Sequence, residues 1–288
     1  MGYIDLHLHS NCSDGILSPT QLVQTARRAG LSSVALCDHD TVAGITEAVQ
    51  ATISAGMRLI PGVELSAAFH GYQDLHLLGY GIALNAPELH DRLQDFARRR
   101  LHRNRQIVAA VNDRLAAQNR KPLQNNDVET LAGGVLGRPH IARALMACGY
   151  VADMQQAFDH YLVPCNIPKH YWQTADALLT IRRAGGVAIL AHPTSITHDY
   201  QLLTEIITEL HGMGLDGVEV YNNVANGAEM LFLQGIARRL NLVVTAGSDF
   251  HGIDPEDQIG KGRGGIRFSD ALLPPLLELA ARRATTAC

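Results

Sequence analysis

Histidine and carboxylate residues recur at or near the ends of short apolar segments along the chain. His7 and His9 stand two positions apart in the segment Asp5-Leu6-His7-Leu8-His9. Side chains alternate between the two faces of a β-strand, so both imidazoles can approach one metal ion. Histidines and carboxylates that were merely solvated surface residues would not recur so regularly near the ends of apolar segments. The nine candidate metal ligands are His7, His9, Asp14, His39, Glu64, His76, His192, Asp249 and His251.

This set of donor atoms indicates which metals and which chemistry the site could support. Imidazole and carboxylate together suit Zn²⁺, Mn²⁺ or Fe²⁺ better than Ca²⁺ or Mg²⁺, which prefer oxygen donors alone. One ion needs three or four protein ligands, so a set of this size predicts two or three ions. Closely spaced ions stabilise the attacking and leaving oxygens of an in-line displacement and supply hydroxide near neutral pH. We therefore expect hydrolysis of a phosphate ester by attack of a metal-bound hydroxide.

The elements that must position these residues alternate between short apolar segments and helical patterns, which is typical of βα units around a parallel sheet. Ser18 can cap the first helix, Pro19 suits its first turn and Gly30 ends it. Further helices are expected at 43–55, 175–184, 202–213, 227–240 and 270–283. Strands are expected at 3–8, 33–37, 58–64, 75–80, 187–191, 217–221 and 242–246.

Residues 86–171 break this alternation and contain no convincing strand pattern. Helices are expected there at 87–118, after Arg138-Pro139 and at 154–161. We predict a barrel domain at 1–85 and 172–288, with a helical insertion over 86–171 that caps the substrate. Because seven strands with intervening helices are expected and no GxGxxG of the nucleotide-binding kind is present, the expected α/β fold is a closed or distorted βα barrel, with a doubly wound open sheet as the alternative. In either fold the site lies at the C-terminal ends of the strands.

Composition excludes several other classes of protein. The 288-residue chain has a formal net charge of −4, with 47% hydrophobic and 18% charged residues, which is typical of a folded globular protein without a general nucleic-acid-binding surface. No apolar run approaches the roughly 20 residues of a membrane helix, and the N-terminus has no leader pattern, so we expect a cytoplasmic protein with no membrane partner. The five scattered cysteines are expected to be reduced thiols. No obligate protein partner is evident.

Five segments together resemble the PHP (polymerase and histidinol phosphatase) family. The resemblance covers about the first 80 residues and residues 186–251, and all nine ligand positions of the family are filled in order. It implies a distorted (β/α)7 PHP barrel that holds three divalent metal ions. Mn²⁺ is the expected metal, with Zn²⁺ and Fe²⁺ as the alternatives. The motifs that carry it are His7-Leu8-His9-Ser10 with Asp14-Gly15, Cys37-Asp38-His39-Asp40-Thr41, Gly62-Val63-Glu64, Ala191-His192-Pro193 and Gly247-Ser248-Asp249-Phe250-His251.

The resemblance also implies how the ligands divide among the ions. The first ion would be held by His7, His9, Glu64 and Asp249. The second would be held by Asp14, His39 and His251. Glu64 would bridge to the third ion, which His76 and His192 would complete.

The insertion motif Gly137-Arg138-Pro139-His140-Ile141-Ala142-Arg143 resembles a narrower branch of the family, which contains 3′,5′-nucleoside bisphosphate phosphatases and 5′-to-3′ RNA exonucleases. The branch implies removal of the 3′-phosphate from a nucleoside 3′,5′-bisphosphate such as pAp. A 5′-to-3′ exoribonuclease acting on short 5′-phosphorylated RNA is the alternative. An amidohydrolase is disfavoured because no lysine ends a strand. A degenerate PHP module is disfavoured by the complete ligand set, and a histidinol phosphate phosphatase by the insertion.

Four residues outside the ligand set are candidate substrate contacts. Arg138 and His140 precede or open a helix, and a helix N-terminus favours phosphate. Arg138 can also bind phosphate through two N–H groups. Asn222 and Asn223 follow the strand 217–221 and are expected to face the site.

Two further predictions concern the surroundings of the site. The arginine-rich segment 98–105 could attract a polyanion, although a solvated helix face is the favoured interpretation. Asp38 and Asp40 flank His39 and are expected to orient its imidazole.

Overall fold

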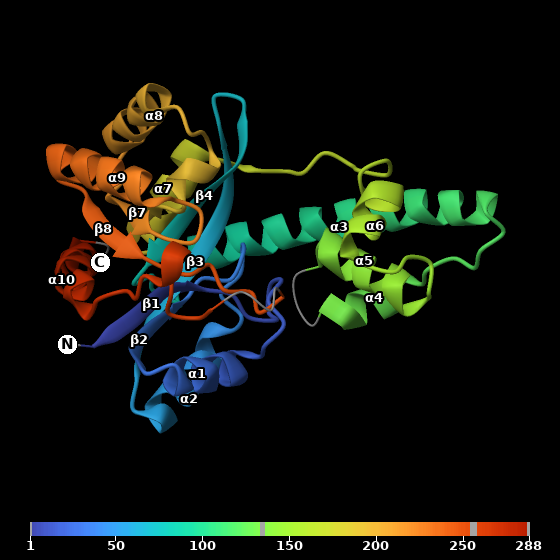
Figure 1. Ribbon diagram of the computed structural model, residues 1–288, viewed down its shortest axis with the longest axis horizontal. Coiled ribbons are helices and arrows are strands. Elements are labelled where there is room, and N and C mark those ends of the chain that lie inside the picture. Colours follow the sequence, from blue (N-terminus) through green and yellow to red (C-terminus); the bar gives the residue numbers. More distant parts are fainter. Residues whose placement is uncertain (1, 133–135, 254–257, 287–288) are drawn as a thin grey trace.

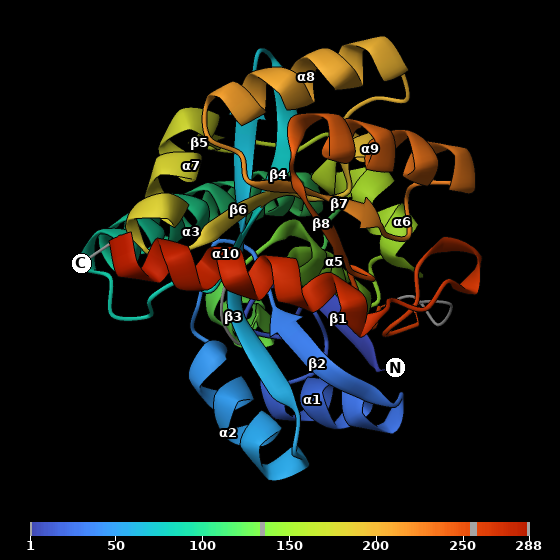
Figure 2. The same cartoon turned by 90° about the vertical axis from the view of Figure 1, so that its left-hand side faces the viewer.

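The computed structural model describes residues 2–132, 136–253 and 258–286. Within them, a mixed α/β fold is built around one sheet, whose strands lie in the order β1-β2-β3-β4-β6-β7-β8 (Figures 1 and 2). The short β5 (Trp172–Gln173) pairs with β3 off this path. The main strands are β1 (Tyr3–Leu8), β2 (Leu31–Leu36), β3 (Arg58–Phe69), β4 (Tyr72–Tyr80), β6 (Val187–Leu190), β7 (Gly217–Tyr221) and β8 (Val243–Ala246).

The two ends of this sheet approach each other. Leu8 forms a parallel bridge with Phe250, and the backbone N–H of His9 donates to the carbonyl of Phe250 at 3.0 Å. Within the described part of the chain this contact replaces a full ladder between β1 and β8. The sheet is therefore curled, and the residues that follow β1 and β8 are neighbours.

The expectation of a wholly parallel sheet is wrong at β3 and β4. These strands are longer than expected and pair antiparallel, from Gly62 opposite Tyr80 to Phe69 opposite Tyr72. His70 and Gly71 connect them, both with positive φ (45° and 86°). A two-residue turn with positive φ at both positions favours a hairpin, because a parallel crossover needs a far longer connection. The antiparallel direction continues into the pairing of β4 with β6.

Helices cover the sheet on several sides (Figure 2). The first, α1, begins after Ser18, whose side chain and Gln21 form a capping box, so the predicted cap is confirmed. The helices packed around the sheet are α1 (Pro19–Arg28), α2 (Ile45–Ala55), α7 (Thr174–Arg183), α8 (Tyr200–Gly212), α9 (Gly227–Leu240) and α10 (Leu273–Thr286). None of the described helices combines the length and hydropathy that crossing a lipid bilayer requires.

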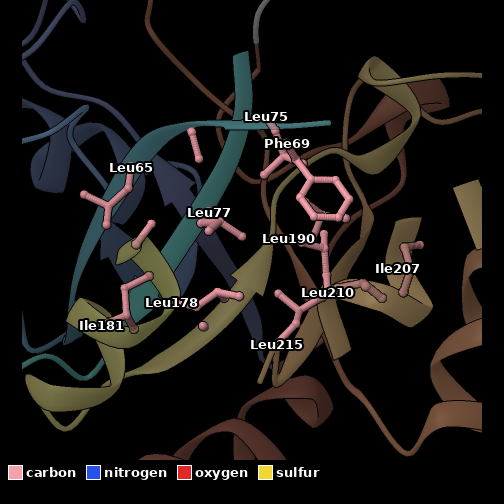
Figure 3. Close-up of a cluster of buried hydrophobic side chains, with 14 of the residues drawn as sticks. Leu65, Phe69, Leu75, Leu77, Leu178, Ile181, Leu190, Ile207, Leu210 and Leu215 are labelled. Carbon is pink, nitrogen blue, oxygen red and sulfur yellow. The ribbon is translucent and has the colours of Figure 1, made fainter. Parts of the chain in front are cut away.

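The main apolar core lies between the sheet and helices α7 and α8. Figure 3 shows Leu65 and Leu77 of the β3–β4 hairpin on the same cluster as Leu178 and Leu210 of these helices. All four side chains are buried. This packing fixes the hairpin, and with it the part of the sheet that carries Glu64.

Helices are the only regular elements in the described part of the predicted insertion. Its helices are α3 (Pro87–Ala117), α4 (Asn125–Ala132), α5 (Arg138–Ala147) and α6 (Met154–Ala157), followed by a π-helical turn, η1 (Phe158–Leu162). The sequence did not predict α4. Apolar residues of α3 at spacings of three and four join both cores: Leu89 and Leu93 face the sheet, whereas Val108 and Val111 belong to a separate helical cluster. Figure 1 shows α3 extending from the sheet into this helical lobe, and the division of the chain at 86–171 stays a proposal.

Candidate metal centre

The candidate ligands come from one region of the curled sheet. His7 lies in β1, and His9 follows that strand directly. The residues after β2, β6 and β8 supply His39, His192 and the pair Asp249 and His251. Glu64 and His76, in contrast, lie within β3 and β4. The expectation that Glu64 ends its strand is therefore wrong, because the hairpin prolongs β3 to Phe69.

Glu64 stands at the middle of the cluster and is fully buried. Its two carboxylate oxygens lie within 3.0–3.3 Å of ring nitrogens from five imidazoles. These imidazoles belong to His7, His9, His39, His76 and His192. One carboxylate thus connects side chains from both halves of the sheet.

The two aspartates complete the connections. Asp249 Oδ1 lies 3.0 Å from His9 Nε2 and 3.4 Å from His7 Nε2. Asp14 Oδ1 lies 3.2 Å from His251 Nε2, and Asp14 Oδ2 lies 3.8 Å from His39 Nε2. All nine candidate ligands are therefore linked in one network.

Three groups of these residues have donor atoms within 4.8 Å of one another, which is close enough to hold a shared ion. The groups are His7, His9, Glu64 and Asp249; His9, Asp14, His39 and His251; and His39, Glu64 and His76. The first two contain the sets that the family resemblance implies, with His9 added to the second. The third contains His39 instead of His192, whose Nδ1 lies 2.8 Å from Ser195 Oγ.

Many of these donor atoms are buried and have no hydrogen-bond partner. A buried polar atom without a partner is costly, so a cluster of them needs another explanation. Imidazole nitrogens and carboxylate oxygens are together the donors that Mn²⁺, Zn²⁺ and Fe²⁺ accept, so the residues present fit a metal centre. The unpartnered atoms are His7 Nε2, His9 Nδ1 and Nε2, Asp14 Oδ1, His39 Nδ1, Glu64 Oε2, His76 Nδ1 and Nε2, and Asp249 Oδ1.

Opposed charges set the protonation of the centre. Burial penalises ionisation of Glu64, but the surrounding imidazoles hold the pKa of its carboxyl well below its usual range. Conversely, burial disfavours the charged form of His9, yet Asp249 and Glu64 raise the pKa of this imidazole to about 10. A cation that binds His9 must therefore displace a proton.

A buried carboxylate that the sequence analysis missed holds two of the candidate ligands, His7 by its imidazole and His192 by its backbone. Glu219 Oε1 lies 3.0 Å from His7 Nδ1, and its Oε2 accepts the backbone N–H of His192 at 2.9 Å. Such a partner fixes the tautomer and direction of a ligand imidazole. The available signal was a carboxylate inside the apolar strand Gly217-Val218-Glu219-Val220-Tyr221.

The backbone is strained and crowded around the ligands. Asp249 and His192 have positive φ (55° and 26°), which is uncommon for residues other than glycine and concentrates at functional sites. A Cβ at Gly247 would overlap the side chain of His7, so only glycine allows the chain directly after β8 to pass this close to β1.

The predicted role of Asp38 and Asp40 is wrong. Asp38 accepts hydrogen bonds from Ser10 and Ser13, and so holds the loop after β1. Asp40 Oδ1 accepts from the backbone N–H of Ser66 and from Trp172 Nε1, both at 3.1 Å. Neither carboxylate forms a hydrogen bond to His39, because the donors that reach them come from the loop after β1 and from strands β3 and β5.

A cavity of about 450 Å³ reaches the centre at Asp14. We call it the cationic cavity, because α3, α5 and the segment before β5 line it with Arg99, Arg100, Arg103, Arg138 and Lys169. The arginines of the segment 98–105 therefore lie in two environments. Arg99, Arg100 and Arg103 line the cationic cavity. Arg98 and Arg105 instead form exposed ion pairs with Asp95 and Glu129.

The candidate substrate contacts occupy different environments. Arg138 lines the cationic cavity, where its guanidinium lies over the ring of Phe158 at 5.4 Å. His140 is buried and accepts the N–H of Gly137 through Nδ1 at 3.0 Å, so it caps α5. Burial, followed by the charge of Arg143, lowers the pKa of His140 to about 4, which keeps its imidazole neutral.

The two asparagines organise backbone rather than reach into the cationic cavity. Asn222 Oδ1 accepts the N–H groups of Val224 and Ala225, and its Nδ2 donates to the carbonyl of Glu219. These bonds give Asn222 a loop-forming role, and the substrate contact of the two asparagines stays a prediction. Asn223 Nδ2 donates to the carbonyl of Ser248, beside Asp249.

Comparison with known proteins gives a consistent result. The PHP domain model matches residues 5–189. A 5′-3′ exoribonuclease from Haemophilus influenzae is 34% identical over 250 residues, covering 86% of this chain and 89% of the relative. A 3′,5′-nucleoside bisphosphate phosphatase from Chromobacterium violaceum is 33% identical over 255 residues, covering 87% and 88%.

A solved structure gives the same picture at the level of the fold. A protein from Bifidobacterium adolescentis, described as a candidate metal-dependent phosphoesterase, superposes with a TM-score of 0.82 at 30% identity. The match covers 96% of both chains, so it includes the helical insertion as well as the sheet.

Proposed function

Because the chain belongs to the PHP domain family, we propose that it is a phosphatase that removes the 3′-phosphate of nucleoside 3′,5′-bisphosphates and leaves the 5′-monophosphate. The coarser activity, that of a metal-dependent phosphoesterase, follows from the family and from the related structure. The observation that carries the finer proposal is the cationic cavity directly beside the Glu64 cluster. A centre for one phosphate and a separate cationic cavity for another suit a substrate with two phosphates.

In this proposal three divalent ions, with Mn²⁺ the best candidate, are held by the nine linked residues around Glu64. Bound divalent ions supply positive charge to phosphoryl oxygens and lower the pKa of water. Glu64 would help to hold more than one ion, since its two oxygens lie beside ring nitrogens of different imidazoles. Glu219 keeps His7 and His192 in place by holding Nδ1 of the first and the backbone N–H of the second.

The cationic cavity binds the phosphate that is not cleaved. Arg138 is oriented for this by Phe158, and Lys169 is held beside the cavity by its ion pair with Asp74 at 2.6 Å. Guanidinium and ammonium groups form strong charge-assisted hydrogen bonds with phosphate oxygens. Hydrolysis then adds the oxygen of water to phosphorus, and the ribose 3′-oxygen leaves with a proton.

A second candidate function is 5′-to-3′ exoribonuclease activity on short RNA. The observation that favours it is the spread of cationic residues over α3, α5 and the segment before β5, which offers a path for more than one phosphate. The same reaction at phosphorus would cleave a diester in place of a monoester.

Product analysis separates the two candidates. Protein loaded with Mn²⁺ would be given pAp, 3′-AMP, AMP and a 5′-phosphorylated RNA trinucleotide at matched concentrations. We expect kcat/KM for pAp to exceed that for 3′-AMP by about 10- to 100-fold, because the second phosphate adds charged hydrogen bonds. The products should be AMP and phosphate.

Two outcomes would contradict the phosphatase proposal. Equal kcat/KM for pAp and 3′-AMP would show that the cationic cavity does not bind a second phosphate. Processing of the trinucleotide alone, to mononucleotides, would make the exoribonuclease the function.

A further inference from the structure

A second cavity, of about 360 Å³, adjoins the cationic cavity and carries the opposite charge. The two cavities share Phe96, His170 and Tyr171 as a common wall. Arg92 is the one cationic arginine or lysine side chain on the described lining of the second cavity. Three carboxylates from α3 and α7 also line this second cavity, so we call it the acidic cavity. They belong to Asp91, Asp95 and Asp176.

Aromatic rings form one side of the acidic cavity. Phe96 and Trp172 stack with ring centroids 5.6 Å apart and planes inclined by 18°. The ring of His170 lies 5.7 Å from that of Phe96. Phe96 and Trp172 are only 5% and 7% exposed, so packing holds this wall in place. A flat, fixed wall in a cavity of this volume suits a planar heterocycle.

The carboxylates of the acidic cavity differ in their availability. Asp95 is engaged by Arg99, whose Nε donates to it at 2.7 Å. Across the described residues, the side chains of Asp91 and Asp176 make no hydrogen bond or ion pair, and both are exposed. Two free carboxylates beside aromatic rings favour a ligand that presents N–H donors and exclude a phosphate.

We propose that the acidic cavity binds the base of the nucleotide whose phosphates occupy the metal centre and the cationic cavity, with a preference for guanine. The two adjoining cavities match the two chemically different parts of a nucleotide. Guanine presents N1–H and the N2 amino group side by side, and one carboxylate can accept both. Uracil presents a single N–H between two carbonyl oxygens, which a carboxylate repels. This inference rests on the proposed function for the nucleotide class of the substrate.

The fluorescence of Trp172, the only tryptophan in the chain, allows a test that needs no turnover. Excitation at the red edge of indole absorption would be followed during titration with GMP, UMP or ribose 5-phosphate. We expect GMP to change the emission saturably, with a Kd about tenfold lower than that of UMP, since one charged hydrogen bond is worth about that factor. Ribose 5-phosphate has the phosphate without a base and should leave the emission unchanged.

Variants connect the preference to the two free carboxylates. Asp91→Asn combined with Asp176→Asn should bring the Kd of GMP to that of UMP. Asp113→Asn is the matched control, because Asp113 is exposed on the same helix α3 but lines neither cavity. Circular dichroism would verify that the variants are folded.

The inference and the proposed function can fail separately. Equal Kd values of GMP and UMP for the unaltered protein would overturn the inference, as would a preference that persists in the double variant. An unchanged emission with every nucleotide would also overturn it. If GMP binds as expected but no phosphate is released from any bisphosphate, the base site stands and the proposed function fails.

Discussion

Glu64 is the residue on which five imidazoles converge, and His9 connects it to Asp249. His9 Nε2 lies 3.2 Å from Glu64 Oε2 and 3.0 Å from Asp249 Oδ1. His9 and Glu64 are fully buried, so water cannot replace a lost ligand without entering the core. The roles of individual side chains are therefore open to direct tests.

Replacing His9 or Asp249 by alanine should abolish turnover and leave the fold intact. Loss of one ligand from a clustered centre removes several kcal/mol of charge stabilisation, so we expect kcat for pAp to fall about 10³-fold or more. Phosphate release and metal content per chain would be measured together. His70→Ala serves as the control, because the side chain of His70 is 63% exposed and pairs with Glu209 outside the centre. Retention of most activity by either ligand variant would show that the assignment is wrong.

Metal binding should release protons, and its affinity should fall as the pH falls. The pKa of His9 is about 10 in the metal-free protein, so this imidazole is protonated at pH 6–8 and its proton competes with the cation. Calorimetric titration with Mn²⁺ in two buffers of different ionisation enthalpy would count the protons released. We expect at least about one per chain at pH 7 and weaker binding at pH 6. Binding without proton release would contradict the charge balance described for the centre.

Glu219→Gln should weaken the centre without removing a ligand. The amide can no longer balance the charge on His7, and loss of such a supporting partner typically costs 10- to 100-fold in metal affinity or activity. The apparent Kd for Mn²⁺ and kcat would both be measured. Glu209→Gln is the matched control, because Glu209 is exposed on α8. If the two variants behaved alike, Glu219 would have no part in orienting His7.

The sequence was sufficient to indicate the candidate ligands that the structure brings together, because all of them except His76 sit in short motifs. It was not sufficient to predict how the supporting residues are used. Asp38 and Asp40 are adjacent to His39 in sequence, yet the donors that satisfy them come from Ser10, Ser66 and Trp172. Glu219 is distant from His7 in sequence and touches it only because the sheet curls. Tertiary contacts of this kind have no local signature.

At the scale of elements, three pieces of chain build the cationic cavity: α3, α5 and the segment before β5. Helical spacing explains the contribution of α3, since Arg99, Arg100 and Arg103 lie three or four positions apart or adjacent on one side of the helix. Arg138 stands at the start of α5. The shape of the cavity therefore depends on how the helices of the insertion pack against the rest of the protein. No single sequence motif predicts that packing.

Arg138→Ala should raise KM for pAp about 10- to 100-fold and change kcat little, because this side chain lines the cavity for the uncleaved phosphate. Steady-state kinetics with pAp and 3′-AMP would separate the effects. Because 3′-AMP lacks the second phosphate, the variant should bind and turn over this substrate almost as the unaltered protein does. Arg98→Ala is the control, because Arg98 is exposed on α3 and pairs with Asp95. An unchanged KM for pAp would show that Arg138 does not bind the uncleaved phosphate and has a structural role only.

The elements themselves were largely predictable from the sequence, apart from their directions. Apolar runs indicated the positions of the main strands, and Ser18 and Pro19 indicated the start of α1. The antiparallel direction of β4 depends on His70-Gly71, a turn that the sequence analysis did not recognise. The helix α4 is short and polar, so its helical period is weak and it emerges only through packing on α5.

At the scale of the whole molecule, the metal centre ties together segments from both ends of the chain. His7 and His9 come from β1 and its end, whereas Asp249 and His251 follow β8. A ligand that binds only the folded state stabilises it by mass action. Occupancy of the centre should therefore affect the stability of the entire sheet.

Removal of metal with a chelator should lower the melting temperature, and Mn²⁺ should restore it. One site filled at a hundredfold excess over its Kd contributes about 2.7 kcal/mol, which corresponds to roughly 5–10 °C for a chain of this size. Thermal unfolding would be followed by circular dichroism with and without Mn²⁺. The Asp249→Ala variant should show a smaller shift. Identical melting temperatures under both conditions would be inconsistent with a metal centre at Glu64.

Phosphate release from pAp, followed as Mn²⁺ is added stepwise to metal-free protein, tests most directly whether the cluster around Glu64 is a phosphatase centre. We predict no release before metal is added, a rise with each equivalent and a plateau at about three ions per chain. AMP should be the nucleotide product. Release at full rate in the presence of a chelator, or no release at any Mn²⁺ concentration, would contradict a metal-dependent phosphatase centre at this cluster.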